Sequence, residues 1–203
     1  MKIALIGISG RVGSRLAAEL LMRGHQLTGI ARDISKVEAK SGLSLKKADA
    51  NLRESLTPVL AQHDVVISST SFTFTEPAVV IDAVKKAGTP RLMVVGGAGG
   101  LEVAPGIALI NAPDFPEAYM PEALGGIEFL KVLNSETELD WTFIAPSAEF
   151  DPGVRTGNYR LGRDQLLIDS AGRSWISMED YAIAFADELE NPQHSRQRFT
   201  VGY

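Results

Sequence analysis

Three glycines near the start of the chain are spaced so that the backbone could hold a phosphate group. They are Gly7, Gly10 and Gly13, in the order G-x-x-G-x-x-G. The apolar residues 2–6 before them predict a buried strand, and residues 14–23 after them are rich in helix formers. In such a turn the first glycine bends the chain, the second admits a phosphate and the third packs against the strand. The unpaired N–H groups at the start of the helix attract the anion.

This glycine spacing departs from the usual G-x-G-x-x-G of dinucleotide-binding proteins, so the glycines alone are weak evidence. Their position between a strand and a helix strengthens the case, and residues 26–31 add a second strand after Gly24. Together these segments form one βαβ unit, which predicts a site for the pyrophosphate of a nicotinamide dinucleotide. The alternative is a turn that only begins a helix.

The end of the second strand bears on which dinucleotide binds. An acidic residue there would accept hydrogen bonds from the ribose hydroxyls of NAD(H). The chain has Arg32 instead, followed by Lys36, with Ser35 as a third donor, and this set suits a 2′-phosphate. We therefore expect NADP(H) to be preferred. Asp33 is a competing signal that keeps NAD(H) open, and a solvated charged segment is the alternative interpretation.

The composition excludes several classes of protein. The chain has 203 residues, which fits one domain, and its net charge of −5 argues against a nucleic-acid partner. It has no cysteine, and its three histidines lie far apart, so we expect neither a disulfide nor a metal site. No apolar run approaches the roughly 18 residues of a membrane span, and no signal segment precedes the first strand. We expect a cytoplasmic monomer or homodimer without a membrane partner.

Strands and helices alternate through the first half of the chain. Further strands are expected at residues 44–49, 65–69 and 91–95, and helices at residues 35–40, 55–62 and 76–87, with Pro58 tolerable only in a first turn. This alternation predicts an α/β fold with a Rossmann-like, doubly wound, mostly parallel sheet and a small C-terminal extension. We treat residues 1–203 as a single domain, in which residues from about 146 onward supply the substrate-side loops and a C-terminal helix.

The second half of the chain is less regular because prolines interrupt it. We expect a helix over about residues 122–134, a strand over 140–144, a loop over 150–161, a short strand over 166–168, a helix over about 178–190 and a closing strand over 198–201. Ser177 followed by Asp180 resembles a capping box at the start of the last helix.

Residues at the ends of the parallel strands are expected to face the dinucleotide, because ligands bind beyond the carboxyl ends of such strands. Ser68, Ser69 and Thr70 end the fourth strand, and the fifth strand runs into residues 96–100, which are mostly glycine. The loop at Asp49 and Ala50 follows the third strand, where a doubly wound fold usually contacts adenine.

Several segments of the chain resemble the atypical short-chain dehydrogenase/reductases. More narrowly, they are similar to the group labelled NADH-flavin reductases, which is related to biliverdin IX-beta reductase (flavin reductase). The resemblance is carried by residues 7–13, Arg32 and residues 139–146, and also by residues 156–160, 176–182 and 198–201. It covers essentially the whole chain and is specific for fold and cofactor rather than for substrate.

This resemblance implies a role for each part of the site. The pyrophosphate would be held by Gly7, Ser9, Gly10, Arg11, Val12 and Gly13, the 2′-phosphate by Arg32 and Lys36, and the adenine by Asp49 and Ala50. Ser68, Ser69, Gly96 and Gly97 would line the nicotinamide half, and Pro146 would close over it.

The proton-transfer residues of standard short-chain dehydrogenases are missing. Those enzymes use a serine after the fifth strand and a Tyr-x-x-x-Lys pair on the next helix. Here glycines follow the fifth strand, Tyr119 is followed four residues later by Ala123, and Pro121 interrupts the expected helix. This counts against an alcohol dehydrogenase or a sugar-nucleotide epimerase. Ser69, Thr70 and Tyr119 remain weak catalytic candidates, and the catalytic residue is unknown.

Hydride transfer to a conjugated ring makes lighter demands, because the protein mainly holds two flat rings in contact. We therefore expect an NAD(P)H-dependent reductase of a flavin, a quinone or a similar acceptor. A non-catalytic NADP(H)-binding redox sensor is the alternative, and an epimerase-like enzyme is a weaker one. The acceptor pocket could use aromatic residues that might equally be core: Phe72, Phe74, Phe115, Tyr119 and Phe150. Glu122 and Glu128 are candidate pocket acids, and solvated positions on a helix surface are the default expectation for both.

Overall fold

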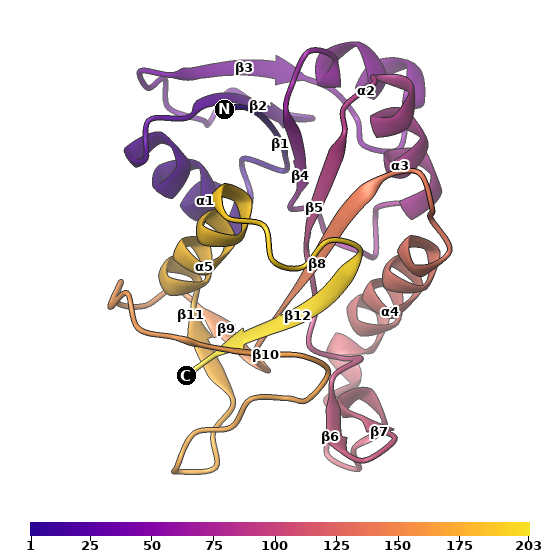
Figure 1. Cartoon of the computed structure of the whole chain (residues 1–203), viewed down its shortest axis with the longest axis vertical. Helices are drawn as coiled ribbons and strands as arrows, with labels where there is room; N and C mark the ends of the chain where they lie inside the picture. Colours follow the sequence, from indigo (N-terminus) through magenta and orange to yellow (C-terminus); the bar gives the residue numbers. More distant parts are fainter.

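A single eight-stranded sheet forms the centre of the molecule in a computed structural model that describes residues 1–203 (Figure 1). Its strands are β1 (Lys2–Ile6), β2 (Gln26–Ala31), β3 (Leu43–Lys47), β4 (Val65–Ser68), β5 (Arg91–Val95), β8 (Asp140–Pro146), β10 (Arg160–Gly162) and β12 (Gln197–Gly202). The order across the sheet is β10-β12-β8-β5-β4-β1-β2-β3. All neighbours are parallel except β10, which runs antiparallel to β12. The predicted Rossmann-like, doubly wound fold class is confirmed.

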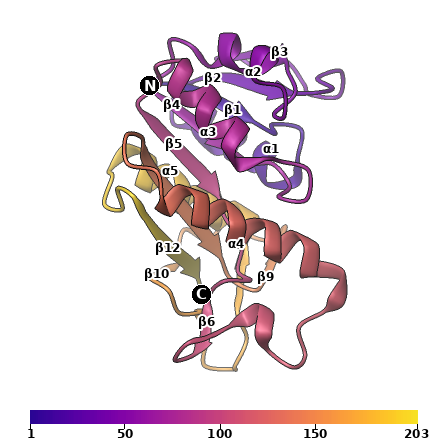
Figure 2. The same cartoon turned by 90° about the vertical axis from the view of Figure 1, so that its right-hand side faces the viewer.

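Helices cover both faces of this sheet (Figures 1 and 2). One face carries α1 (Arg11–Met22) and α5 (Met178–Glu190), and the other carries α2 (Arg53–Leu60), α3 (Pro77–Lys86) and α4 (Met120–Asn134). Alternate residues of each strand enter separate cores, so that Ile3 packs in one cluster and Ala4 in the other. Burial on both faces explains why the strands are apolar without alternation.

The crossover from β2 to β3 contains no helix, so the prediction of a helix over residues 35–40 is wrong. The segment begins with a turn in which the N–H of Ser35 donates to Asp33 Oδ1 at 2.9 Å. Ile34 and Val37 then pack against the core cluster on the α1 face. Six residues are too few for a stable helix unless packing supports it, and this stretch has no continuous apolar stripe.

Short strands outside the central sheet were not predicted. A hairpin joins β6 (Glu102–Ala104) to β7 (Ile107–Ala108), and β9 (Glu149–Asp151) pairs with β11 (Trp175–Ser177). The strand predicted over residues 166–168 is absent, and β10 begins instead in the last two residues of the predicted loop over 150–161. Two 3₁₀ helices, η1 (Leu109–Asn111) and η2 (Glu117–Tyr119), precede α4.

Two expectations about prolines also need correction. Because α4 begins at Met120, Pro121 lies in its first turn, where a missing N–H costs nothing, and does not interrupt the helix. Pro58 lies inside α2, because that helix begins at Arg53 and not at residue 55. The cap of α5 is confirmed, since the N–H of Asp180 donates to Ser177 Oγ at 3.0 Å.

None of the helices combines the length and the apolar character that a membrane crossing requires.

Candidate nucleotide site

The glycine turn after β1 is packed so tightly that side chains cannot be added to it. Gly7 has φ +86°, and a Cβ there would lie closer than 3.0 Å to the backbone of Ser69. A Cβ on Gly13 would lie within 3.0 Å of the carbonyl of Gly7. The N–H of Gly10 donates to the same Gly7 carbonyl at 2.9 Å, and α1 begins directly afterwards. The turn therefore presents the start of α1 beside the end of β4, which is the geometry of an anion site.

Backbone from three strand ends meets at this edge of the sheet. The N–H of Ser69 donates to Ile6 O at 2.9 Å, and the N–H of Gly96 donates to Ile144 O at 2.8 Å. A Cβ on Gly96 would collide with the Phe143 ring, whereas the nearest atom to a Cβ on Gly97 would be a Phe72 ring carbon at 3.7 Å. Gly97 is half-buried, and at this position the chain presents backbone without a side chain.

The remaining predicted residues on the nicotinamide side differ in exposure. Ser68 is buried and its hydroxyl lies 3.3 Å from that of Thr70. Pro146 ends β8 and is buried. The structure therefore brings Ser68, Ser69, Gly96 and Gly97 to the edge that carries the glycine turn, since β1, β4, β5 and β8 are parallel.

The two predicted 2′-phosphate cations are free. Arg32 and Lys36 are exposed and make no side-chain hydrogen bond or ion pair. The competing acid, Asp33, is engaged in its own turn, and hydrogen bonds from Ser35 hold the pKa of its carboxyl below the ordinary value. A hollow of about 430 Å³ lies between α1 and this segment, with Ser9 and Lys36 in its lining. Lys40 also lines this hollow, together with the acids Asp33 and Glu38, whereas Arg32 lies outside its lining.

The loop after β3 is fixed by its own hydrogen bonds. The N–H of Asp49 donates to Ser55 Oγ at 3.2 Å, and Asp49 Oδ1 accepts from the N–H of Asn51 at 2.9 Å. Asp49 and Ala50 are each half-buried. The predicted adenine contact is therefore a rigid loop end.

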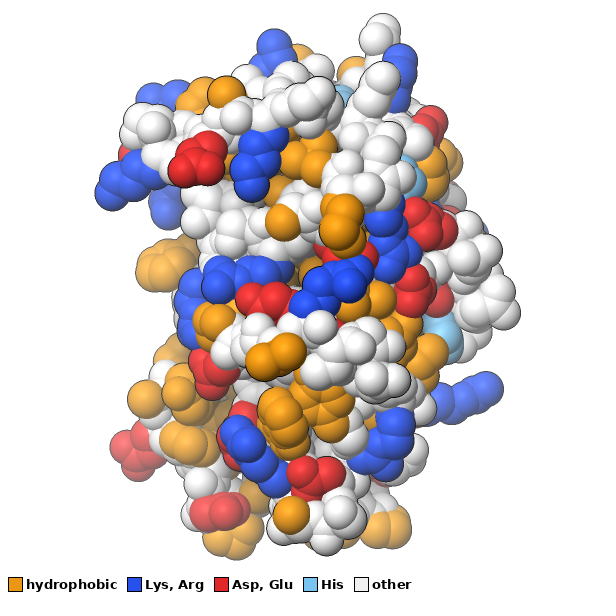
Figure 3. All heavy atoms as spheres, turned by 90° about the vertical axis from the view of Figure 1, so that its left-hand side faces the viewer, with side chains coloured by type: hydrophobic (Ala, Val, Ile, Leu, Met, Phe, Trp, Pro, Cys, Tyr) orange, Lys and Arg blue, Asp and Glu red, His pale blue; other side chains and the backbone are white.

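Arg11 is engaged by another part of the chain. Its guanidinium lies 2.7 Å from Asp151 of β9, and Arg15, one turn along α1, lies 3.1 Å from Glu179 of α5. Both members of the first pair are exposed, so we expect the pair to contribute little stability and to leave Arg11 able to turn toward a ligand. Figure 3 shows cations and acids gathered across this face of the molecule.

Two residues at this edge have roles that the sequence did not reveal. Glu122, in the first turn of α4, accepts hydrogen bonds from the loop after β4, and the side chain of Asn51 contacts the same loop farther along. Glu122 is therefore not simply a solvated acid. No local sequence pattern marks Glu122 or Asn51, because the loop residues that each one contacts lie far from it in the sequence.

Comparison with known families identifies the class of ligand that the chain binds. Residues 7–192 match a family model described as NAD(P)H-binding. The chain belongs to this NAD(P)H-binding family. The protein YwnB of Bacillus subtilis (strain 168) is 39% identical over 211 residues, covering 99% of this chain and 98% of YwnB.

Solved structures of relatives share the whole fold. A putative epimerase from Bacteroides thetaiotaomicron superposes with a TM-score of 0.95 at 44% identity, covering 100% of this chain and 96% of that one. A putative NADH-flavin reductase from Streptococcus pneumoniae TIGR4 has a TM-score of 0.87 at 33% identity, with 100% and 99% covered. The predicted resemblance to atypical short-chain dehydrogenase/reductases is confirmed, and the chain is an NAD(P)H-binding protein with an oxidoreductase fold.

The Tyr-x-x-x-Lys pair of standard short-chain dehydrogenases has no counterpart in this chain, as the sequence predicts. Tyr119 is 65% exposed at the start of α4, and its hydroxyl makes no hydrogen bond. Ala123, at the position of the missing lysine, packs closely against Gly99. Ser69 and Thr70 lie beside the glycine turn, where they can contact a bound ligand.

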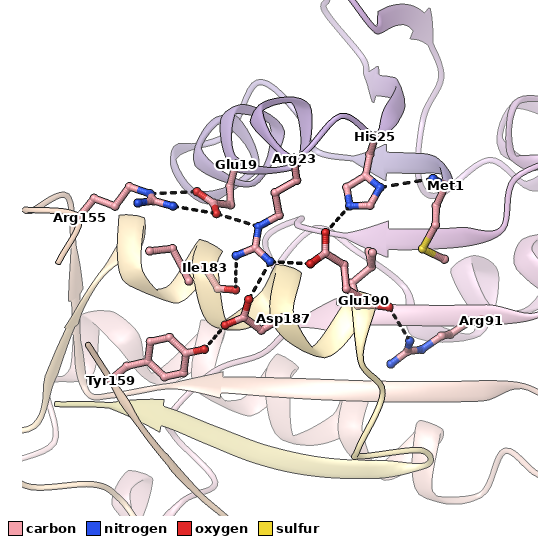
Figure 4. A network of polar contacts seen from close by, with 11 residues as sticks. Met1, Glu19, Arg23, His25, Arg91, Arg155, Tyr159, Ile183, Asp187 and Glu190 are labelled. Carbon is pink, nitrogen blue, oxygen red and sulfur yellow. Dashed lines mark hydrogen bonds and ion pairs between the residues drawn. The ribbon is translucent and has the colours of Figure 1, made fainter. Parts of the chain in front are cut away.

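A polar network far from the glycine turn joins α5 to α1 (Figure 4). Buried Glu19 pairs with Arg23 at 2.9 Å and with Arg155 at 3.0 Å, and Arg23 continues to Asp187 at 2.7 Å. Burial, and then the hydrogen bond to Asp187, raise the pKa of the Tyr159 hydroxyl well above its ordinary range. The network holds the two helices together and takes no part in the candidate site.

Proposed function

We propose that this chain is an NADPH-dependent oxidoreductase that transfers hydride to a flavin, a quinone or a similar conjugated acceptor. The half-buried backbone at Gly97, which carries no side chain and lies at the same edge as the glycine turn, is the observation that carries this proposal. It offers a flat floor on which two rings can lie in contact, and such a transfer needs no protein proton donor. The name of the Streptococcus pneumoniae relative, a putative NADH-flavin reductase, agrees with a flavin acceptor, although it names NADH and not NADPH.

In this proposal the chain binds and orients, and the bound nicotinamide supplies the hydride. The N–H groups at the start of α1 hold the pyrophosphate, Arg32 and Lys36 hold the 2′-phosphate, and Ser69 and Gly97 border the reacting ring. The glycine turn fits this role, because a Cβ at Gly7 would collide with the backbone of Ser69 and one at Gly13 with that of Gly7, so the tight turn needs both glycines.

The direct test is to titrate the purified protein with NADPH and NADH and then add FMN or a quinone. We expect NADPH oxidation at about 1 to 1000 per second, the range of ordinary enzymes. If no acceptor in a panel of flavins and quinones oxidises NADPH faster than the protein-free blank does, the proposed reductase activity is wrong. Tight binding without oxidation would instead support a redox sensor whose partner recognises the nucleotide-bound form.

An epimerase-like activity is the second candidate, because the Bacteroides thetaiotaomicron relative is named an epimerase. Turnover of a sugar nucleotide would support it. The absence of a lysine one turn after Tyr119 weighs against it, since that lysine lowers the pKa of the tyrosine in standard enzymes.

Replacing Arg32 by alanine is expected to weaken NADPH binding and to leave NADH binding unchanged. A charge-assisted bond to the 2′-phosphate would be lost, and such bonds contribute about 1.5 to 3 kcal/mol, or roughly 10- to 100-fold in Kd. Fluorescence titration of both nucleotides measures this difference. Lys131→Ala is the matched control, because Lys131 is an exposed cation on α4 that pairs only with Glu128. An equal loss for NADPH and NADH would refute the assignment.

A further inference from the structure

The aromatic side chain of Phe74 is exposed to solvent. Its exposed fraction is 70%, although it lies in the loop between β4 and α3, next to the candidate site. Phe72, two residues earlier, behaves as a core residue: its ring packs against Phe129 and Phe143, and Gly125 and its neighbour in α4 make room for it. The packed ring of Phe72 thus anchors the loop to the core, and the ring of Phe74 remains exposed to solvent.

Glu122 fixes the first half of this loop from the side of α4. Its Oε1 accepts from the N–H of Phe72 at 2.8 Å. Its Oε2 accepts from Ser71 Oγ at 2.7 Å and from the N–H of Thr73 at 3.1 Å. One carboxylate is therefore committed to three consecutive residues of a single loop, and the charge makes these hydrogen bonds strong.

Asn51 fixes the second half of the loop from the side of β3. Its Nδ2 donates to the carbonyl of Phe74, and its Oδ1 accepts from the N–H of Glu76 at 2.9 Å. The backbone of Phe74 is held on both sides, so only the two side-chain torsions of its ring remain free. Little conformational entropy is left to lose when a ligand binds the ring.

We propose that Phe74 is a stacking platform for a planar heteroaromatic ring bound at the carboxyl edge of the sheet. An exposed ring on a loop that two side chains from different elements hold in place is prepared for a ligand, because the loop is already ordered before binding. Its loop starts at Ser69, beside the glycine turn, and Asn51 directly follows the predicted adenine contact. The ring that stacks is the adenine of the cofactor or the acceptor ring, so this inference rests on the proposed function.

Calorimetry on Phe74→Ala with two probes shows whether the adenine of the cofactor or the ring of the acceptor stacks on Phe74. One probe is 2′,5′-ADP, which carries the adenine without the nicotinamide, and the other is FMN with NADP⁺ present. We expect the stacking probe to bind about 5- to 100-fold more weakly, as when a base loses an aromatic partner. Phe74→Trp should bind that probe as tightly as the wild type does, because it keeps an aromatic ring at this position. If neither probe loses affinity, the platform is wrong.

The matched control for Phe74→Ala is Leu124→Ala, which removes an exposed apolar side chain of α4. It should bind both probes as the wild type does. Because the experiment measures binding alone, it succeeds or fails separately from the proposed reductase, which depends on NADPH oxidation. If a probe stacks on Phe74 but no acceptor is reduced, the proposed reductase activity is wrong and the stacking role of Phe74 still stands.

Glu122 is then a positioning residue that acts through Phe74. Glu122→Gln retains the shape but replaces one accepting oxygen by a donor, which would face a backbone N–H. We expect a smaller loss of ring affinity than for Phe74→Ala, and no further loss when both changes are combined, because the two residues act in series. The control is Glu128→Gln on the same helix, where the carboxylate pairs only with Lys131. Additive losses, or a lowered melting temperature with unchanged ring affinity, would overturn this role.

Discussion

Replacing Gly13 by alanine is expected to cost about 3 kcal/mol of stability and to weaken NADPH binding at least about 100-fold. The added Cβ would lie 2.9 Å from the carbonyl carbon of Gly7 and 3.1 Å from the Cα of Ile8, and closer still to the Gly7 oxygen. All of these atoms are backbone, so no change of rotamer relieves the collision. Either α1 moves away from the turn or the turn opens, and both displace the N–H groups that face the phosphate.

Urea denaturation and fluorescence titration with NADPH measure the two effects of Gly13→Ala. Gly97→Ala is the control for stability, because its Cβ would make an ordinary 3.7 Å contact with the Phe72 ring. We expect it to change the free energy of unfolding by less than about 1 kcal/mol. A folded Gly13→Ala protein with wild-type affinity for NADPH would show that the phosphate binds elsewhere.

Asp180→Asn is expected to destabilise the protein by about 3 kcal/mol, because it breaks a buried set of charge-assisted hydrogen bonds. Asp180 is fully buried in the first turn of α5. Its carboxylate accepts from the N–H groups of Thr156 and Gly157 at 2.7 and 2.9 Å, from the hydroxyl of Thr156, and from that of Tyr203 at 2.6 Å. An amide offers one oxygen to these donors and turns its own N–H₂ group toward the others.

The same carboxylate gives stability a predictable pH dependence. Burial raises the pKa of Asp180, but the hydrogen bonds from Thr156, Tyr203 and Gly157 outweigh it and hold the pKa below the ordinary value of 3.8. The unfolded state therefore binds a proton first as the pH falls, so the stabilisation is complete above the ordinary pKa and is lost as the pH falls through the folded value.

Urea unfolding of wild type and Asp180→Asn, followed from pH 7 downward, checks this sign. The stability gap between them should stay constant to about pH 5 and shrink below pH 4. Asp114→Asn serves as the control, because Asp114 is exposed and makes no hydrogen bond. A gap that widened in acid would contradict the expected direction.

The first βαβ unit could be predicted because its determinants are local. Gly7 has a positive φ, Gly13 is required by backbone contacts with Gly7 and Ile8, and the strands on either side are continuous apolar runs. The hairpin of β6 and β7 was missed although a signal exists, since Pro105 and Gly106 form a turn in which Gly106 has φ +74°.

Other features could not be predicted because they depend on distant contacts. Leu166 and Leu167 are apolar, as in a strand, but the N–H of Leu166 donates to the carbonyl of Glu102 in the hairpin. The strand that pairs with β12 at the edge of the sheet is β10 instead. The partners of Glu122 lie 49 to 51 residues away in sequence. A single sequence contains no period or spacing that connects such residues.

The packing of α5 on α1 also bears on how the chain is made. Leu16 and Leu20 of α1 are buried in the core cluster that contains Phe185 of α5, and the ion pair of Arg23 with Asp187 joins residues 164 positions apart. At a synthesis rate of about 5 to 20 residues per second, α5 leaves the ribosome roughly 10 to 30 s after α1. For that interval the nascent chain lacks the helix that covers Leu16 and Leu20 of α1. We therefore expect α1 to be the segment that a ribosome-associated chaperone binds.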